Sequence, residues 1–178
     1  MTLPHRSATV TQTPSENARV ECFSYRNGEL HCETTPLSLI AAAVGTPTYV
    51  YSREAVLESF AAYRRALAAV PHLICYSMKA NGNLALLALL AQAGAGVDVL
   101  SGGELFRALT AGMDPKKVVF AGVGKQPVEM REALKAGILM FNVESPGELR
   151  QLDRVAQELG LKAPVGLRVN PDVDPETH

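Results

Sequence analysis

The stretch HLICYSMKANGNLALLALLAQAGAGVDVLS, residues 72–101, decides the fold. It begins with an apolar segment of strand length (72–78) and continues through an Ala/Leu-rich segment of helix length (83–93). After Gly94, it ends in a second apolar segment of strand length (96–101). A strand, a helix and a strand in this order predict a right-handed crossover between two parallel strands of one sheet.

The same alternation continues on both sides of this unit. Further strands are predicted over 47–52, 117–123, 138–143 and 164–170, and further helices over 53–70, 104–111, 127–136 and 146–159. Six strands that alternate with five helices predict a parallel α/β fold, either a (β/α) barrel or a doubly wound sheet. The strands are short and evenly spaced, and no G-x-G-x-x-G follows the first of them, which favours a TIM-type barrel.

The chain length limits how much of a barrel can form. A complete (β/α)₈ barrel needs about 250 residues, whereas this chain has 178. An open barrel leaves a strand edge unpaired, which natural proteins avoid. We therefore expect an incomplete barrel of about six of the eight βα units, in a chain that is a fragment of a longer protein.

The first 45 residues follow a different pattern. The arm-like start is rich in Thr, Ser and Pro, and Asn27-Gly28 within FSYRNGELHCE is a strong signal for a β-hairpin. A short helix is expected over 36–44, before Gly45 and Pro47. The predicted organisation is a loose arm (1–20), a hairpin with a short helix (21–45) and a partial barrel (46–178).

The composition excludes several classes of function. A net charge of −1 without a basic stripe gives no reason to expect nucleic acid or an acidic membrane surface as a partner. Three cysteines without metal-ligand spacing indicate a reduced compartment and no metal site. No apolar signal core is visible, and the longest apolar run, 84–91, is too short to span a bilayer. A cytoplasmic globular protein is expected.

Lys79 is the first candidate site residue. It follows the apolar strand 72–78, and a period of two places Leu73, Cys75, Ser77 and Lys79 on one face. Catalytic groups of parallel barrels lie at the carboxyl ends of the strands. A lysine at the barrel mouth would be partly desolvated and suited to Schiff-base chemistry. The alternative is a lysine that ends a strand and points into water.

Asp98 and Arg168 are the other two candidates, because each interrupts an otherwise apolar strand. A buried carboxylate needs a partner, and for Asp98 this would be Lys79 or Arg168. A guanidinium inside a barrel suits carboxylate or phosphate recognition. The alternatives are a structural salt bridge or helix cap for Asp98, and for Arg168 a structural ion pair with Asp98 or another acid.

Two glycine-rich loops, 101–105 (SGGEL) and 122–126 (GVGKQ), stand at predicted helix starts, where backbone N–H groups can hold an anion. The alternative is that their glycines only make tight turns. His178 could be catalytic but is the last residue.

Several segments resemble one known family. CYSMKANGN (75–83) resembles the Y-x-x-K-A-N-x-N motif of the fold-type III, alanine racemase-like enzymes that use pyridoxal 5'-phosphate (PLP). GVDVLSGGEL (96–105) is similar to a stretch of the diaminopimelate decarboxylase family. FAGVGKQPVEM, FNVESPGEL and LRVNPDVD follow in that family's order and spacing, so the likeness covers about residues 23–178.

This resemblance implies a PLP-dependent amino-acid decarboxylase in which Lys79 carries the cofactor and Asp98 and Arg168 lie near it. The implied reaction converts meso-2,6-diaminopimelate to L-lysine and carbon dioxide in lysine biosynthesis. The family also implies a barrel, a second β-rich domain that includes the hairpin, and a homodimer at full length.

In that family, the glycine loop for the phosphate, the histidine that stacks on the ring and the partner's cysteine lie beyond the matching segments. We therefore expect the 178-residue chain to be inactive alone. Two alternatives stay open. One keeps the fold and PLP but takes ornithine, arginine or carboxynorspermidine as substrate; the other is a PLP-binding barrel without turnover.

Overall fold

The computed structural model describes residues 21–173. The expected arm (1–20) and His178 therefore lie outside the described residues. The chain divides into two compact units, Met1–Glu54 and Ala55–His178.

The first unit contains a small antiparallel sheet of order β1-β2-β3, formed by Phe23–Arg26, Glu29–Cys32 and Thr35–Pro36, and the helix α1, Leu37–Val44. The turn between β1 and β2 is made by Asn27 and Gly28, whose φ angles are 52° and 82°. Two consecutive positive φ values are what a two-residue hairpin turn of type I′ requires. The predicted hairpin and short helix are confirmed.

The strand predicted over 47–52 is wrong. This segment belongs to no sheet, and the large side chains of Tyr49 and Tyr51 are exposed. Alternating apolar residues form a strand only when a second strand offers a hydrogen-bonding edge. No described strand forms a ladder with this segment, so the apolar pattern has no sheet to support it.

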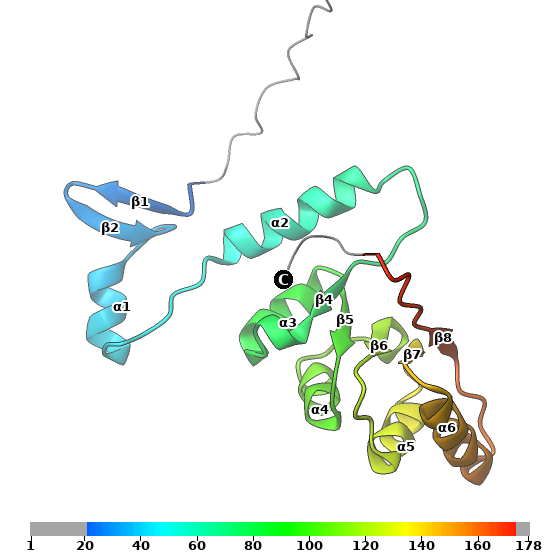
Figure 1. Cartoon of the computed structure of the whole chain (residues 1–178). Helices are drawn as coiled ribbons and strands as arrows, with labels where there is room; N and C mark the ends of the chain where they lie inside the picture. The colour runs from blue at the N-terminus through cyan, green and yellow to red at the C-terminus, as the bar shows by residue number, and fades with distance from the viewer. Residues whose placement is uncertain (1–20, 174–178) are drawn as a thin grey trace, which may run out of the picture. The chain divides into compact units, whose positions relative to one another are not determined.

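The second unit alternates helices and parallel strands (Figure 1). Its helices are α2 (Arg53–Ala66, whose first two residues belong to the first unit), α3 (Leu84–Gln92), α4 (Gly102–Thr110), α5 (Pro127–Ala136) and α6 (Pro146–Leu159). Its strands are β4 (Cys75–Ser77), β5 (Gly96–Val99), β6 (Val118–Phe120), β7 (Met140–Val143) and β8 (Val165–Leu167). Two short 3₁₀ turns, η1 (Met78–Ala80) and η2 (Pro115–Lys117), complete it.

The sheet order is β4-β5-β6-β7-β8, and all neighbouring strands are parallel. A doubly wound sheet reverses its strand order at a switch point, and this sheet does not. The described residues thus contain five parallel strands, one fewer than the six predicted, because 47–52 does not join them.

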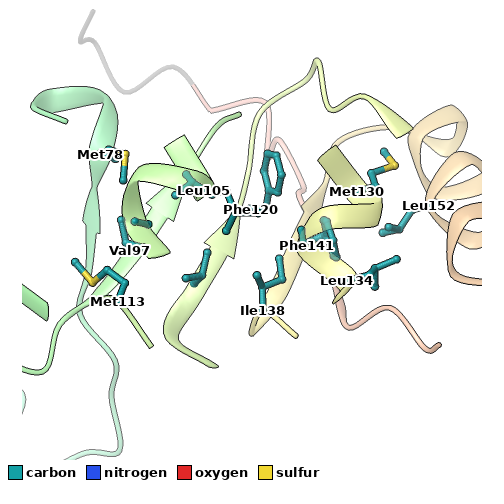
Figure 2. Close-up of a cluster of buried hydrophobic side chains, with 14 of the residues drawn as sticks. Met78, Val97, Leu105, Met113, Phe120, Met130, Leu134, Ile138, Phe141 and Leu152 are labelled. Carbon is teal, nitrogen blue, oxygen red and sulfur yellow. The ribbon is translucent and has the colours of Figure 1, made fainter. Parts of the chain in front are cut away.

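The two faces of this sheet differ in chemistry. On one face, Val97, Val99, Phe120 and Phe141 are fully buried among side chains of α3 to α6. Figure 2 shows this core, with Phe120, Phe141, Met130, Leu134 and Leu152 among its labelled side chains; the Phe120 and Phe141 rings stack with centroids 5.9 Å apart. The opposite face carries the polar residues Ser77, Asp98 and Asn142 beside Cys75, Val119 and Met140, and these side chains are only partly buried. Helices that cover one face leave the other available for a site.

Within residues 21–173, no helix is long and apolar enough to cross a membrane.

Candidate functional site

Lys79 lies at the carboxyl end of β4, in the middle of η1. The regular strand ends at Ser77, so the predicted alternation stops two residues before Lys79. The buried side chain of Met78 anchors the turn in the core, while Lys79 itself is exposed. The predicted partial desolvation of Lys79 is therefore wrong for residues 21–173, because β4 is an edge strand of the described sheet.

The two asparagines that follow Lys79 shape the chain around it. The Asn83 side chain accepts hydrogen bonds from the N–H groups of Ala85 and Leu86 and so caps α3. Asn81 Oδ1 accepts the N–H of Asn83 at 3.0 Å, and the Asn81 carbonyl accepts the Tyr76 hydroxyl at 3.1 Å. The turn that presents Lys79 is thus held by local hydrogen bonds.

Asp98 lies on β5, opposite Ser77 of β4 in the ladder. Its Oδ1 atom is the one buried side-chain N or O atom in the described part of the chain without a hydrogen-bond partner. Burial raises the pKa of Asp98 above its ordinary 3.8. The charges of Lys79 and Arg168 and the Ser77 side chain act in the opposite direction, whereas Glu104 adds to the rise. The other two predicted site residues, Lys79 and Arg168, therefore lie within electrostatic reach of Asp98.

Arg168 follows β8 directly, and its backbone N–H still bonds to the Val143 carbonyl at 3.0 Å. Its Nη1 donates to both carboxylate oxygens of Glu144, each at 3.3 Å. The guanidinium side chain is 66% exposed and that of Glu144 11%. The ion pair expected for Arg168 is therefore formed with an acid other than Asp98, namely Glu144.

Sequence reasoning missed Lys125, which lies between β6 and α5. Its side chain is 0% exposed, and its Nζ donates three hydrogen bonds of 2.7 Å, to the carbonyls of Gly122 and Asn142 and to Glu148 Oε1. The sequence shows a lysine in the glycine-rich loop GVGKQ and an acid in SPGEL, but it gives no indication that the two side chains form an ion pair.

In both glycine-rich loops, a backbone N–H group donates a hydrogen bond to a glutamate carboxylate of the same chain. The N–H of Gly102 bonds to Glu129 Oε1 at 2.6 Å, and that of Gly122 to Glu144 Oε1 at 2.9 Å. Gly122 has a φ of 91°, which favours glycine. The structure thus favours the alternative in which the glycines make tight turns, and it shows in addition that the protein's own acids occupy these N–H groups.

A shallow pocket of about 230 Å³ lies near Ile138 and Pro164, which precede β7 and β8. It is therefore at the amino ends of the strands, away from the three predicted site residues. Active sites of parallel barrels occupy the opposite, carboxyl ends.

The geometry suits a ligand with an electrophilic carbon and negative charge. Lys79 offers an exposed amine, Asp98 a buried carboxylate oxygen that lacks a donor, and Arg168 an exposed guanidinium. An amine can condense with an aldehyde, and a carboxylate beside it can accept its N–H. These groups fit an aldehyde cofactor that carries an anionic group.

Comparison with known proteins gives a consistent result. Residues 53–178 match the family model described as pyridoxal-dependent decarboxylase, pyridoxal binding domain. A diaminopimelate decarboxylase of Pseudomonas aeruginosa is 58% identical over 159 residues, which are 89% of this chain and 38% of that protein.

Two solved structures are similar in fold. Diaminopimelate decarboxylase from M. jannaschii, in complex with L-lysine, has a TM-score of 0.83 and 36% identity over 89% of this chain and 38% of its own. The Helicobacter pylori enzyme, also with L-lysine, has a TM-score of 0.77 and 43% identity over 80% of this chain and 36% of its own.

The chain spans about 38% of the length of the curated relatives it matches. The family model, however, covers most of the chain and includes Lys79, Asp98 and Arg168. This chain therefore belongs to the pyridoxal-dependent decarboxylase family, and residues 53–178 match its pyridoxal binding domain.

Proposed function

We propose that the protein containing this chain is a diaminopimelate decarboxylase that carries PLP on Lys79 and converts meso-2,6-diaminopimelate to L-lysine. The observation that carries the site assignment is the position of the Lys79 amine near Asp98, whose buried oxygen lacks a donor. The substrate assignment is supported by 45% to 58% identity with eight curated diaminopimelate decarboxylases.

Each residue has a distinct role in this proposal. Lys79 would hold the cofactor through its Nζ, and the same Nζ would hold a proton for return to the product. Asp98 would accept a hydrogen bond from the Lys79 amine and so keep the amine directed at the site. Arg168, oriented by Glu144, offers its remaining N–H groups to a ligand anion. The chemistry that PLP would supply at this site is an acceptor for the electrons released on decarboxylation.

We also infer that β4 to β8 are part of a closed (β/α)₈ barrel in the whole protein. The sequential order of parallel strands and the helices on one face support this inference. The hairpin sheet would then belong to a second, β-rich domain, and the whole protein would be a homodimer.

An assay of the full-length gene product on a panel of amino acids tests the substrate. Carbon dioxide release is measured with meso-diaminopimelate, ornithine, arginine, lysine and carboxynorspermidine at matched concentrations. We expect kcat/KM for meso-diaminopimelate to exceed the others by about 100-fold or more, as expected for a site that leaves buried polar groups unpaired with the wrong substrate. A preference for another amino acid would overturn the substrate, and bound PLP without turnover would overturn the activity.

A further inference from the structure

We propose that Lys125 is a positioning residue, which sets the place of Arg168 through Glu148 and Glu144. This inference rests on the proposed function, because it assigns Lys125 a part in preparing the cofactor site. Lys125 itself does not touch the ligand in this account.

Lys125 is fully enclosed and fully bonded. An ammonium group has three N–H donors, and here each donor has one acceptor at 2.7 Å. The acceptors come from three segments: Gly122 after β6, Asn142 in β7 and Glu148 in α6. One buried cation thus ties the carboxyl ends of two neighbouring strands to the start of a helix.

The bonds continue from Glu148 to Arg168. Glu148 uses Oε1 for Lys125 and Oε2 for the backbone N–H of Glu144, at 3.2 Å. Glu144 in turn accepts the N–H of Gly122 at 2.9 Å and contacts Arg168 Nη1. Glu144 is therefore fixed on both sides by residues that Lys125 holds, and Glu144 is the acid that orients Arg168.

The orientation of the Arg168 side chain depends on Glu144. Arg168 is 66% exposed, so few neighbours other than Glu144 restrict its side chain. If Lys125 is removed, Glu148 becomes a buried acid without its cation, and the backbone on either side of Glu144 loses its anchor. The carboxylate that orients Arg168 then shifts, and the effect reaches the ligand through Arg168 alone.

A double-mutant cycle in the full-length protein tests this route. The variants are Lys125→Met, Arg168→Ala and the pair, and the measurements are the PLP dissociation constant, the visible spectrum of bound PLP, and kcat and KM. We expect Lys125→Met to weaken PLP binding about 10-fold, and to add no further loss in the Arg168→Ala background. Losses that multiply in the pair, or a Lys125→Met variant with unchanged PLP binding, would overturn the proposal.

Two controls separate positioning from stability. Val155→Ala removes core volume on α6 without touching the network, so it lowers the melting temperature but leaves PLP binding unchanged. Lys135→Met removes an exposed lysine of α5 and changes neither. If Val155→Ala weakens PLP binding as much as Lys125→Met does, the effect is one of stability and the proposal is wrong.

If Lys125→Met does not fold, Glu148→Gln tests the next link of the same route. Its effect on PLP binding should also vanish in the Arg168→Ala background, and an additive effect would overturn the proposal. Measurements on the wild-type protein separate failure of the proposed function from failure of the inference about Lys125. Failure of wild type to bind PLP at Lys79 overturns the proposed function, and the inference with it, whereas an additive cycle in an active wild type overturns the inference alone.

Discussion

Asp98 lies opposite Ser77 in the parallel ladder of β5 and β4, and its Oδ1 atom is buried without a hydrogen-bond partner among residues 21–173. A buried polar atom without a partner costs stability. Protein sites that bind ligands often carry such costs, because the missing partner arrives with the ligand. Because the buried Oδ1 atom of Asp98 lowers stability, stability does not explain why this carboxylate is present in the fold.

Asp98→Asn should stabilise the cofactor-free protein and weaken its function. The pKa of Asp98 is raised, mainly by burial, so the ionised form is disfavoured in the fold. The contribution of this group to stability is complete below the ordinary pKa of 3.8 and is lost as pH rises through the raised value. A neutral isostere should therefore raise the melting temperature at about pH 7. It should lower the decarboxylation rate about 10-fold, since the charge-assisted hydrogen bond that we propose between Lys79 and Asp98 in the loaded protein could not form.

Thermal unfolding and activity measurements on the same preparations check both halves of this prediction. Asp153→Asn, an exposed acid on α6, is the matched control and should change neither by much. A lower melting temperature for Asp98→Asn at neutral pH would contradict the electrostatic argument.

Gly96→Ala should destabilise the second unit by about 1–3 kcal/mol, the usual cost of an overpacked core. A Cβ at this position would lie 2.6 Å from the Lys117 carbonyl oxygen and 2.8 Å from Cys75 Sγ. The carbonyl belongs to the chain that enters β6, so it cannot move without shifting that strand.

Chemical denaturation provides the measurement, and Gly103→Ala the control. Gly103 lies in α4, where a Cβ would meet only Ser101 Oγ at 3.9 Å. Alanine should therefore stabilise the helix there by about 0.5–1 kcal/mol. Equal effects of the two substitutions would show that the close approach at Gly96 does not matter.

Glu33 should make the first unit sensitive to acid. Its Oε1 accepts the N–H of Glu54 at 2.8 Å and the Ser52 hydroxyl at 2.7 Å. These bonds, the one from Glu54 first, lower the pKa of Glu33 from 4.5. The stabilisation is present above that ordinary value and is lost as pH falls through the lowered pKa.

We therefore expect Glu33→Gln to be less stable than wild type at about pH 7, with a difference that shrinks as the solution becomes strongly acidic. Thermal unfolding of both proteins across this pH range is the measurement. Glu132→Gln, at an exposed position of α5, controls for the loss of one negative charge. A difference for Glu33→Gln that grows as pH falls would contradict the assignment.

Local sequence signals predicted the exact first and last residues of two helices. The helices α5 and α6 have the predicted bounds, because Pro127 and Pro146 stand at their first positions. Gly137 and Gly160 end them in the left-handed conformation. The hairpin turn was likewise predicted from two adjacent residues, Asn27 and Gly28. Interactions within a few residues decide these boundaries, and the sequence displays them directly.

Features that depend on distant partners could not be read in the same way. Residues 47–52 have the composition of a strand but lack a pairing edge in residues 21–173. The burial of Lys125 depends on acceptors from three separate segments. Position along the strands made Asp98 and Arg168 candidates, but it could not show that Glu144 is the acid that binds Arg168.

The central claim is that Lys79 carries the cofactor. Its most direct test is reduction of the PLP-loaded full-length protein with borohydride, followed by peptide mapping of the pyridoxyl group. We predict a single labelled peptide, the one that contains Lys79, and loss of that label in Lys79→Ala. A stoichiometric label on any other lysine, with Lys79 unmodified, would contradict the account.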